Sequence, residues 1–235
     1  MAIKPILFNT EMVRAILDGR KSCTRRIVKP KQFVGLLPDK CKNGAPEEFL
    51  KEKKLMFKPH CDMTDIELIN TAYKAPYQIG DILYVRETWQ YLYELDGNEQ
   101  VIEDTGKYYY AATDTIPFNT YVDKNGVEHD HAPWRPSIHM PKEAARIWMK
   151  VTDVRVERLQ DMDWQDALYE GIDMCLERDM KTGEYIFPDE NPLDDFIDLW
   201  DSTIKKSDID RYGWDANPYV WVIEFERCEK PKEEN

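Results

Sequence analysis

The chain has 235 residues, of which 42% are hydrophobic and 33% are charged, and its formal net charge at pH 7 is −13. This composition is typical of a soluble globular protein with a sizeable core, and it excludes an intrinsically disordered chain. The acidic balance also argues against a protein that holds long nucleic acid through a broad basic face.

No apolar run approaches the roughly 20 residues that span a bilayer, and the first residues lack a signal-peptide pattern. We therefore expect a cytoplasmic protein without a membrane partner. The cysteines form no C-x-x-C pair, and His60-Cys61 with Cys41 fits no common zinc spacing. We expect no disulfide framework, no metal site and no cofactor.

The first elements are predicted in quick succession. Residues 5–9 form a short apolar strand, and Asn9 or Thr10 then caps a helix over residues 10–18. Gly19 suits the left-handed position after a helix, and a second strand follows over residues 23–28.

The middle of the chain alternates between insertions and strands. Residues 31–75 are rich in Lys, Glu, Pro and Asn and are predicted to be an insertion. A turn over 76–81 leads to a strong strand over 82–87, which residues 89–92 extend. A Tyr-rich strand over 107–112 divides two polar stretches, 94–106 and 113–133.

The last third predicts further helices and strands. Residues 142–145 form a short helix, and 147–159 form one long strand or two short ones. Asp163 caps a helix over 164–170 that ends at Gly171, Asn191-Pro192 opens another, and residues 219–225 form a closing strand. Because there is no regular βαβ alternation, we predict an α+β fold built on a small, closed, mixed β-barrel with short helices around it.

The segment after the first helix concentrates positive charge. Six basic residues and no acidic one lie between Arg20 and Lys31, in a chain whose net charge is −13. This favours a local anion or nucleotide pocket. The alternative is a solvated basic edge near a helix C-terminus, where cations are stabilised in any case.

Four stretches together resemble the ASCH domain, a member of the PUA-like β-barrel superfamily. They are residues 16–26 (ILDGRKSCTRR), 79–89 (IGDILYVRETW), 151–171 and 219–225 (YVWVIEF). Residues 134–141 and 212–218 resemble a subgroup common in bacteriophages and prophages. The resemblance implies one PUA-like domain over residues 1–235, with poorly matched polar insertions at about 32–75 and 94–133. It also implies a cleft that binds a nucleotide, a modified base or RNA.

Some small ASCH proteins are amidohydrolases that deacetylate acetylated cytidine, and the resemblance places their catalytic residues at Lys21, Thr24 and Glu170. Arg26 matches a further basic position of the same segment. In that mechanism Glu170 and Lys21 activate Thr24 or a water, because a hydroxyl needs an adjacent base. The alternative is a structural Lys21–Glu170 ion pair beside an ordinary strand threonine.

Further ligand-binding candidates flank this set. Arg25 belongs to the same basic run. Glu87 is suited to accept a hydrogen bond from an exocyclic amine, or else to pair with Arg86 or Arg26. Trp89 is suited to stack on a base, with core packing as the alternative. Ser137 and His139 lie in a Pro-bounded loop that is a weaker candidate for the cleft.

Three functions follow as hypotheses. The first is a binding module for a nucleotide, a modified base or RNA. The second is an amidohydrolase acting on an acylated nucleobase. The third is a phage accessory or assembly protein without catalysis.

Overall fold

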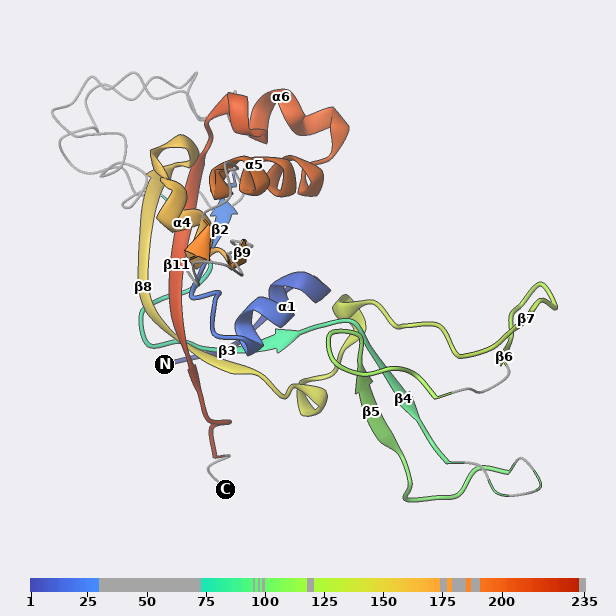
Figure 1. The fold of residues 1–235 in the computed structure, drawn as a ribbon. Helices are drawn as coiled ribbons and strands as arrows, with labels where there is room; N and C mark the ends of the chain where they lie inside the picture. The colour runs from blue at the N-terminus through green and yellow to red at the C-terminus, as the bar shows by residue number, and fades with distance from the viewer. Residues whose placement is uncertain are drawn as a thin grey trace, which may run out of the picture. The chain divides into compact units, whose positions relative to one another are not determined.

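The computed structural model shows a mixed α+β fold with a five-stranded sheet and short helices (Figure 1). It describes residues 1–29, 73–94, 96, 98, 100–117, 121–173, 177–178, 185–186 and 191–232. Within this part of the chain, no helix is long and apolar enough to cross a membrane.

The chain divides into two compact units. Two of the four boundaries fall inside strands β8 (Trp148–Arg158) and β11 (Tyr219–Cys228), and the other two follow Gly19 and Gly80. Unit 1 comprises Met1–Gly19, Asp81–Lys150 and Arg227–Asn235. Unit 2 comprises Arg20–Gly80 and Val151–Glu226.

Unit 1 is built around strands β1 (Ile3–Leu7) and β3 (Ile82–Arg86), which pair in parallel. β3 pairs antiparallel with the first residues of β8. Helix α1 (Thr10–Leu17) follows β1 in the sequence and completes the first segment of unit 1, which ends at Gly19. The Asn9 side chain caps it by accepting from the Met12 amide, and Gly19 adopts φ 78° beyond its end.

Two hairpins complete unit 1: β4 (Trp89–Leu92) with β5 (Lys107–Tyr110), and β6 (Tyr121–Val122) with β7 (Glu128–His129). Short 3₁₀ helices follow at Ser137–His139 and Lys142–Ala144. The second of these takes the place of the helix predicted over 142–145. A core cluster of this unit contains Ile82, Trp89, Met140, Ala144, Ala145 and Trp148.

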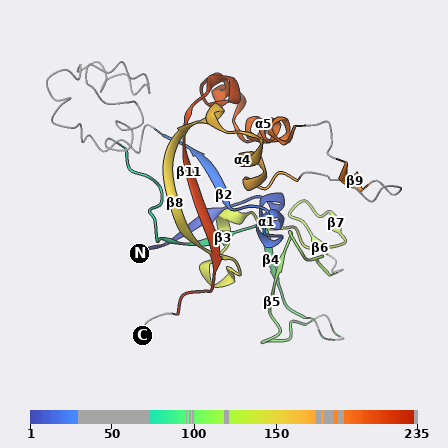
Figure 2. The same cartoon turned by 60° about the vertical axis from the view of Figure 1, so that its left-hand side comes forward.

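Unit 2 contains strand β2 (Cys23–Ile27), which pairs antiparallel with β11 so that Thr24 lies opposite Ile223. Helices α4 (Trp164–Tyr169) and α5 (Pro192–Thr203) lie next to each other beside these strands (Figures 1 and 2). Residues of these helices, of β11 and of the segment between β8 and α4 form a core cluster: Leu159, Met162, Ala167, Phe196, Trp200, Val220 and Val222. On α5, Phe196 and Trp200 are therefore core residues.

The remaining elements of unit 2 are short. Helix α6 (Ile209–Tyr212) stands between 3₁₀ helices at Lys206–Asp208 and Trp214–Ala216. A further 3₁₀ helix, Leu159–Asp161, follows β8, and β9 (Glu177–Arg178) pairs with β10 (Tyr185–Ile186).

The α+β class is confirmed, but the described strands do not close into a barrel. Their order is β1-β3-β8-β11-β2, which starts and ends on different strands. The structure divides into two compact units, and the assignment of residues 1–235 to a single domain stays a prediction. The insertion expected at about 32–75 lies almost wholly outside the described residues, and the one at 94–133 contains β5 and the β6–β7 hairpin.

Candidate functional site

Lys21 and Glu170 form a buried ion pair inside unit 2. The Lys21 Nζ donates to Glu170 Oε2 at 2.7 Å and to the Glu170 carbonyl oxygen at 2.6 Å. The exposed fraction is 0% for the lysine side chain and 4% for the carboxylate. Local structure positions the two side chains. Glu170 is the C-terminal cap of α4, and the Ser22 amide, next to Lys21, donates to the Tyr169 carbonyl, next to Glu170. The structure thus brings together two of the three residues predicted to be catalytic.

Arg25 extends the same buried cluster from β2. Its Nη2 lies 3.2 Å from Asp166 Oδ2 and 3.7 Å from Glu157 Oε2, and its Nη1 lies 3.5 Å from Glu170 Oε1. Burial by itself would lower the pKa of Arg25, but Glu170 and the neighbouring anionic groups raise it overall. Arg25 is therefore a fixed cation, held in place by three carboxylates.

Cys23 shares this environment, one position along the same face of β2. Burial, followed by the nearby negative charge of Glu170, raises the pKa of its thiol from 9.0 to about 12. The thiol is therefore neutral at physiological pH and is unsuited to act as a nucleophile.

Thr24 is buried, with 1% exposure, but it occupies the alternate position on β2. Successive side chains of a strand point to opposite faces, so Thr24 lies on the face opposite that of Cys23 and Arg25. Within the described chain, its hydroxyl makes no hydrogen bond with Lys21 or Glu170. The catalytic role of the three residues stays a prediction.

A hollow of about 410 Å³ borders β2 in unit 2. β2 is the outermost strand in the sheet order, which allows consecutive side chains to border one hollow. The described residues that line it include three cationic and two aromatic ones and no acidic one: Arg25, Arg26, Ile27, Lys29, Pro76, Tyr77, Trp200, Thr203 and Ile204.

Two lining residues of this hollow affect each other electrostatically. Desolvation lowers the pKa of Arg26, and the attraction of Glu170 and Tyr77 only partly opposes it. Burial raises the pKa of Tyr77, against the pull of Arg26. Arg26 and Tyr77 are therefore electrostatically coupled at the border of this hollow.

The other predicted ligand-binding residues belong to unit 1. Glu87 follows β3 and is 1% exposed. It accepts two hydrogen bonds of 2.9 Å from Arg146, whose guanidinium also stacks over the Tyr110 ring at 4.0 Å. The expected partners Arg86 and Arg26 are therefore wrong: Glu87 pairs with Arg146, and Arg86 donates to the carbonyls of Met140 and Ile138.

Trp89, Ser137 and His139 also have defined surroundings in unit 1. Trp89 is 5% exposed and packs in the core, with the Arg135 guanidinium 5.3 Å from its ring centre. Ser137 and His139 form the 3₁₀ helix that Arg86 anchors, by donating to the carbonyls of Ile138 and Met140. Ser137 is half-buried and His139 is exposed.

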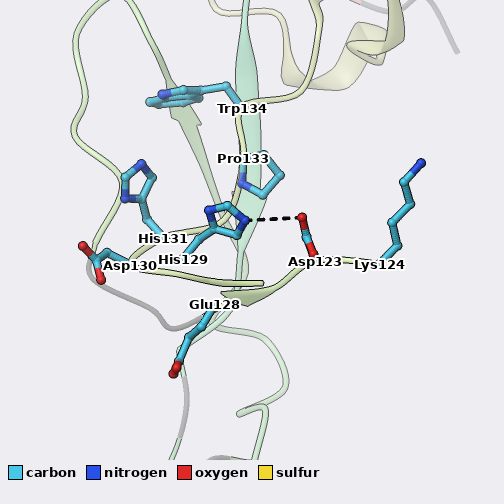
Figure 3. A pocket seen from close by; sticks show the side chains of 8 residues that line it. All are labelled: Asp123, Lys124, Glu128, His129, Asp130, His131, Pro133 and Trp134. Atoms are coloured by element: carbon cyan, nitrogen blue, oxygen red, sulfur yellow. Dashed lines mark ion pairs between the residues drawn. The ribbon is translucent and has the colours of Figure 1, made fainter. Parts of the chain in front are cut away.

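A second, larger hollow of about 720 Å³ lies at the β6–β7 hairpin of unit 1 (Figure 3). Asp123 and His129 face each other at 3.5 Å, whereas Glu128 points away from both. Most of its lining residues are exposed, and no set of three or more His, Cys, Asp and Glu side chains in the described chain is placed to hold a metal ion. The larger volume of this hollow therefore does not make it a better candidate for a ligand site than the hollow beside β2. The larger hollow is lined by Asp123, Lys124, Glu128, His129, Asp130, His131, Pro133 and Trp134.

Sequence reasoning missed the partners that come from distant segments. Arg146 meets Glu87 across 59 positions, and no local pattern links them. Asp166 was detectable, since it lies four residues before Glu170 on one helix and therefore on the same side. Tyr77 and Trp200 border the hollow only because the fold brings their segments to β2.

Comparison with known proteins returned no match: no family model, no curated protein and no solved structure matches this chain.

Proposed function

We propose that unit 2 binds a nucleotide, either free or within RNA, in the hollow beside β2. The observation that carries this proposal is the lining, in which Arg26 and Lys29 lie with the ring of Tyr77, in a chain of net charge −13. Guanidinium and ammonium groups suit phosphate, and an aromatic ring beside them suits a base.

The proposal agrees with the ASCH resemblance of residues 16–26, which includes Arg25 and Arg26. We therefore also propose that the fold is related to the PUA-like domains. The site differs from the expected one in its centre: Arg26 and Tyr77 line the hollow, whereas Lys21 and Glu170 are paired with each other and are not among its lining residues.

The test is calorimetric titration of the full chain with the four ribonucleoside 5′-monophosphates and with a short RNA. We expect saturable binding of at least one ligand. Changing both Arg26 and Lys29 to Ala should weaken it at least about tenfold, because each charge-assisted hydrogen bond is worth roughly 1.5–3 kcal/mol. Lys124→Ala, which removes an exposed cation from unit 1, is the matched control and should leave affinity unchanged.

Two results would defeat this proposal. One is the absence of binding to every nucleotide and to RNA, which would favour the accessory-protein hypothesis. The other is equal affinity in the wild type and in the Arg26/Lys29 variant.

Binding is preferred to amide hydrolysis because the Lys21 ammonium already donates to two oxygens of Glu170 and its side chain has no exposed surface. The amidohydrolase stays a hypothesis with a direct assay, acetate release from acetylated cytidine. Thr24→Val is the informative variant, since it removes the hydroxyl while keeping the shape of a buried residue. Release by the wild type that Thr24→Val abolishes would restore the catalytic interpretation.

A further inference from the structure

One face of the β4–β5 hairpin in unit 1 is a row of aromatic rings (Figure 1). Trp89 lies opposite Tyr110, and Tyr91 lies opposite Tyr108, so both pairs are on the same face of the hairpin. The ring centres of Tyr91 and Tyr108 are 4.6 Å apart, and those of Tyr91 and Tyr93 are 5.2 Å apart. Tyr93 therefore continues the face beyond β4, and we call these five residues the aromatic row.

The inner end of the aromatic row already holds two arginines of the same chain. The Arg135 guanidinium lies 5.3 Å from the centre of the Trp89 ring, and the Arg146 guanidinium lies 4.0 Å from that of Tyr110. Arg146 also donates to both carboxylate oxygens of Glu87 at 2.9 Å. A ring and a carboxylate thus hold one arginine together, which is the combination that suits a guanidinium.

The outer end of the row presents rings that no described cation covers. Tyr91 and Tyr108 are half-buried, and Tyr93 is 46% exposed. In the part of the chain that the structure describes, no lysine or arginine lies over these three rings. Lys107 is on the other face of the hairpin, with its ammonium 5.4 Å from the centre of the Tyr109 ring.

Negative charge accompanies the outer end. Residues 94–106, which join the two strands, contain five acidic residues and no basic one. Burial raises the pKa of the Tyr91 phenol, and Tyr93, Tyr108 and the Asp104 carboxylate add to the rise, so Asp104 lies within electrostatic reach of that ring. Such a surface attracts a cationic partner, whereas it repels phosphate groups and a second copy of the same acidic segment.

We propose that the outer end of the aromatic row docks a basic segment of a partner protein, whose arginine side chains stack on the tyrosine rings and pair with Asp104. The outer end would then hold an arginine in the way that Tyr110 and Glu87 hold Arg146. Tyrosine and arginine are also enriched at protein interfaces and among the residues that dominate binding energy. The inference concerns unit 1 and does not depend on nucleotide binding by unit 2.

The experiment uses the full chain and a short fluorescein-labelled peptide with arginine at alternate positions, and measures binding by fluorescence anisotropy. A matched peptide carries citrulline, which has the shape of arginine without its charge. We expect saturable binding of the arginine peptide and at least about tenfold weaker binding of the citrulline peptide. A lysine peptide of equal charge should bind severalfold more weakly than the arginine peptide, because an ammonium lacks the planar, two-donor fork.

Four variants separate this surface from the general acidity of the chain. Tyr93→Ala removes an exposed ring without changing the charge and should weaken the arginine peptide about fivefold. Tyr169→Ala, which removes a tyrosine of α4 that is 55% exposed, is its matched control and should leave the affinity unchanged. Asp104→Asn removes one charge, suits the φ of 67° at this position and should weaken binding severalfold. Asp195→Asn, at an exposed position of α5, is the control for charge.

Several results would overturn the proposal. One is equal binding of the arginine and citrulline peptides, and another is an affinity for the arginine peptide that Tyr93→Ala and Asp104→Asn leave unchanged. RNA binding that is lost in Tyr93→Ala would assign the row to nucleic acid. A dimer in analytical ultracentrifugation that Tyr93→Ala dissociates would assign it to a second copy of the chain.

Discussion

At the scale of single residues, the Lys21–Glu170 pair is the most consequential contact of unit 2. Both side chains are almost fully buried, and the lysine makes two hydrogen bonds to one residue. Removing one partner from such a pair leaves a charge in a medium that solvates it poorly. The pair therefore stabilises the segment that leads into β2, whatever the hollow binds.

We predict that Lys21→Met lowers the free energy of unfolding by roughly 3–5 kcal/mol, the usual effect of breaking a buried pair from one side. Urea denaturation measures this change. Glu11→Gln is the control: its carboxylate pairs with Arg14 at 2.7 Å but is 75% exposed, so its removal should change stability by about 0–1 kcal/mol. Adding Glu170→Gln to Lys21→Met should recover part of the loss, and a loss within the range of the control would contradict the buried geometry.

Cys23 gives a prediction about pH. Its pKa is raised from 9.0 to about 12, first by burial and then by Glu170. A raised pKa in the folded state stabilises the protein fully below the unfolded value, and this contribution is lost as the pH rises from about 9 toward 12. The difference in unfolding free energy between the wild type and Cys23→Ala should therefore shrink from pH 8 to pH 10.5. A difference that stays constant over that interval would refute the shift.

The same burial predicts how the thiol reacts. Iodoacetamide at pH 8 should modify Cys228, which is partly exposed, well before Cys23, which is 4% exposed and protonated. Mass-spectrometric peptide mapping over time measures both sites in one sample. Equal labelling rates would show that the segment around β2 opens readily.

At the scale of elements, α4 positions two of the carboxylates around Arg25. Asp163 caps it by accepting from the amides of Gln165 and Asp166, and Asp166 accepts in return from the Asp163 amide. We predict that Asp163→Ala lowers the unfolding free energy by about 1 kcal/mol, whereas Asp163→Asn, a good capping residue, retains most of it. Thermal melts of the two variants test this, and equal melting temperatures would argue against the cap.

The elements themselves were largely predictable, because their signals are local. Asn9, Asp163 and Asn191 cap the helices as expected, and Gly19 and Gly171 have the positive φ expected of glycines after helices. Which strands pair was not predictable in the same way. The parallel contact of β1 with β3 depends on residues nearly 80 positions apart, and no short pattern encodes it.

The candidate site shows the same division. The basic run identified Arg25 and Arg26, because charge concentration is visible in the sequence. In a regular strand, successive side chains such as those of Thr24 and Arg25 point to opposite faces. That this rule applies to them follows from the structure, which shows that β2 begins at Cys23. Partners such as Tyr77 depend on tertiary packing and could not be read from the chain.

At the scale of the whole molecule, the charge is uneven: a net −13 overall, with a three-cation lining at one hollow. We predict that a 12-nucleotide RNA binds with a salt dependence typical of one or two phosphates, because the chain offers a local site and not a long basic track. The slope of log K against log salt should be about −0.7 to −1.4. A much steeper slope, measured by titration at several KCl concentrations, would indicate an extended contact.

The pairing of β2 with β11 has a consequence for how the protein is made. Thr24 meets Ile223, so the two strands of this pair are synthesised near opposite ends of the sequence. During translation, β2 therefore has no partner strand until the chain beyond Glu224 has left the ribosome. Ribosome-bound chains halted before β11 should therefore be cleaved readily by protease within residues 20–29, and the released full chain should resist.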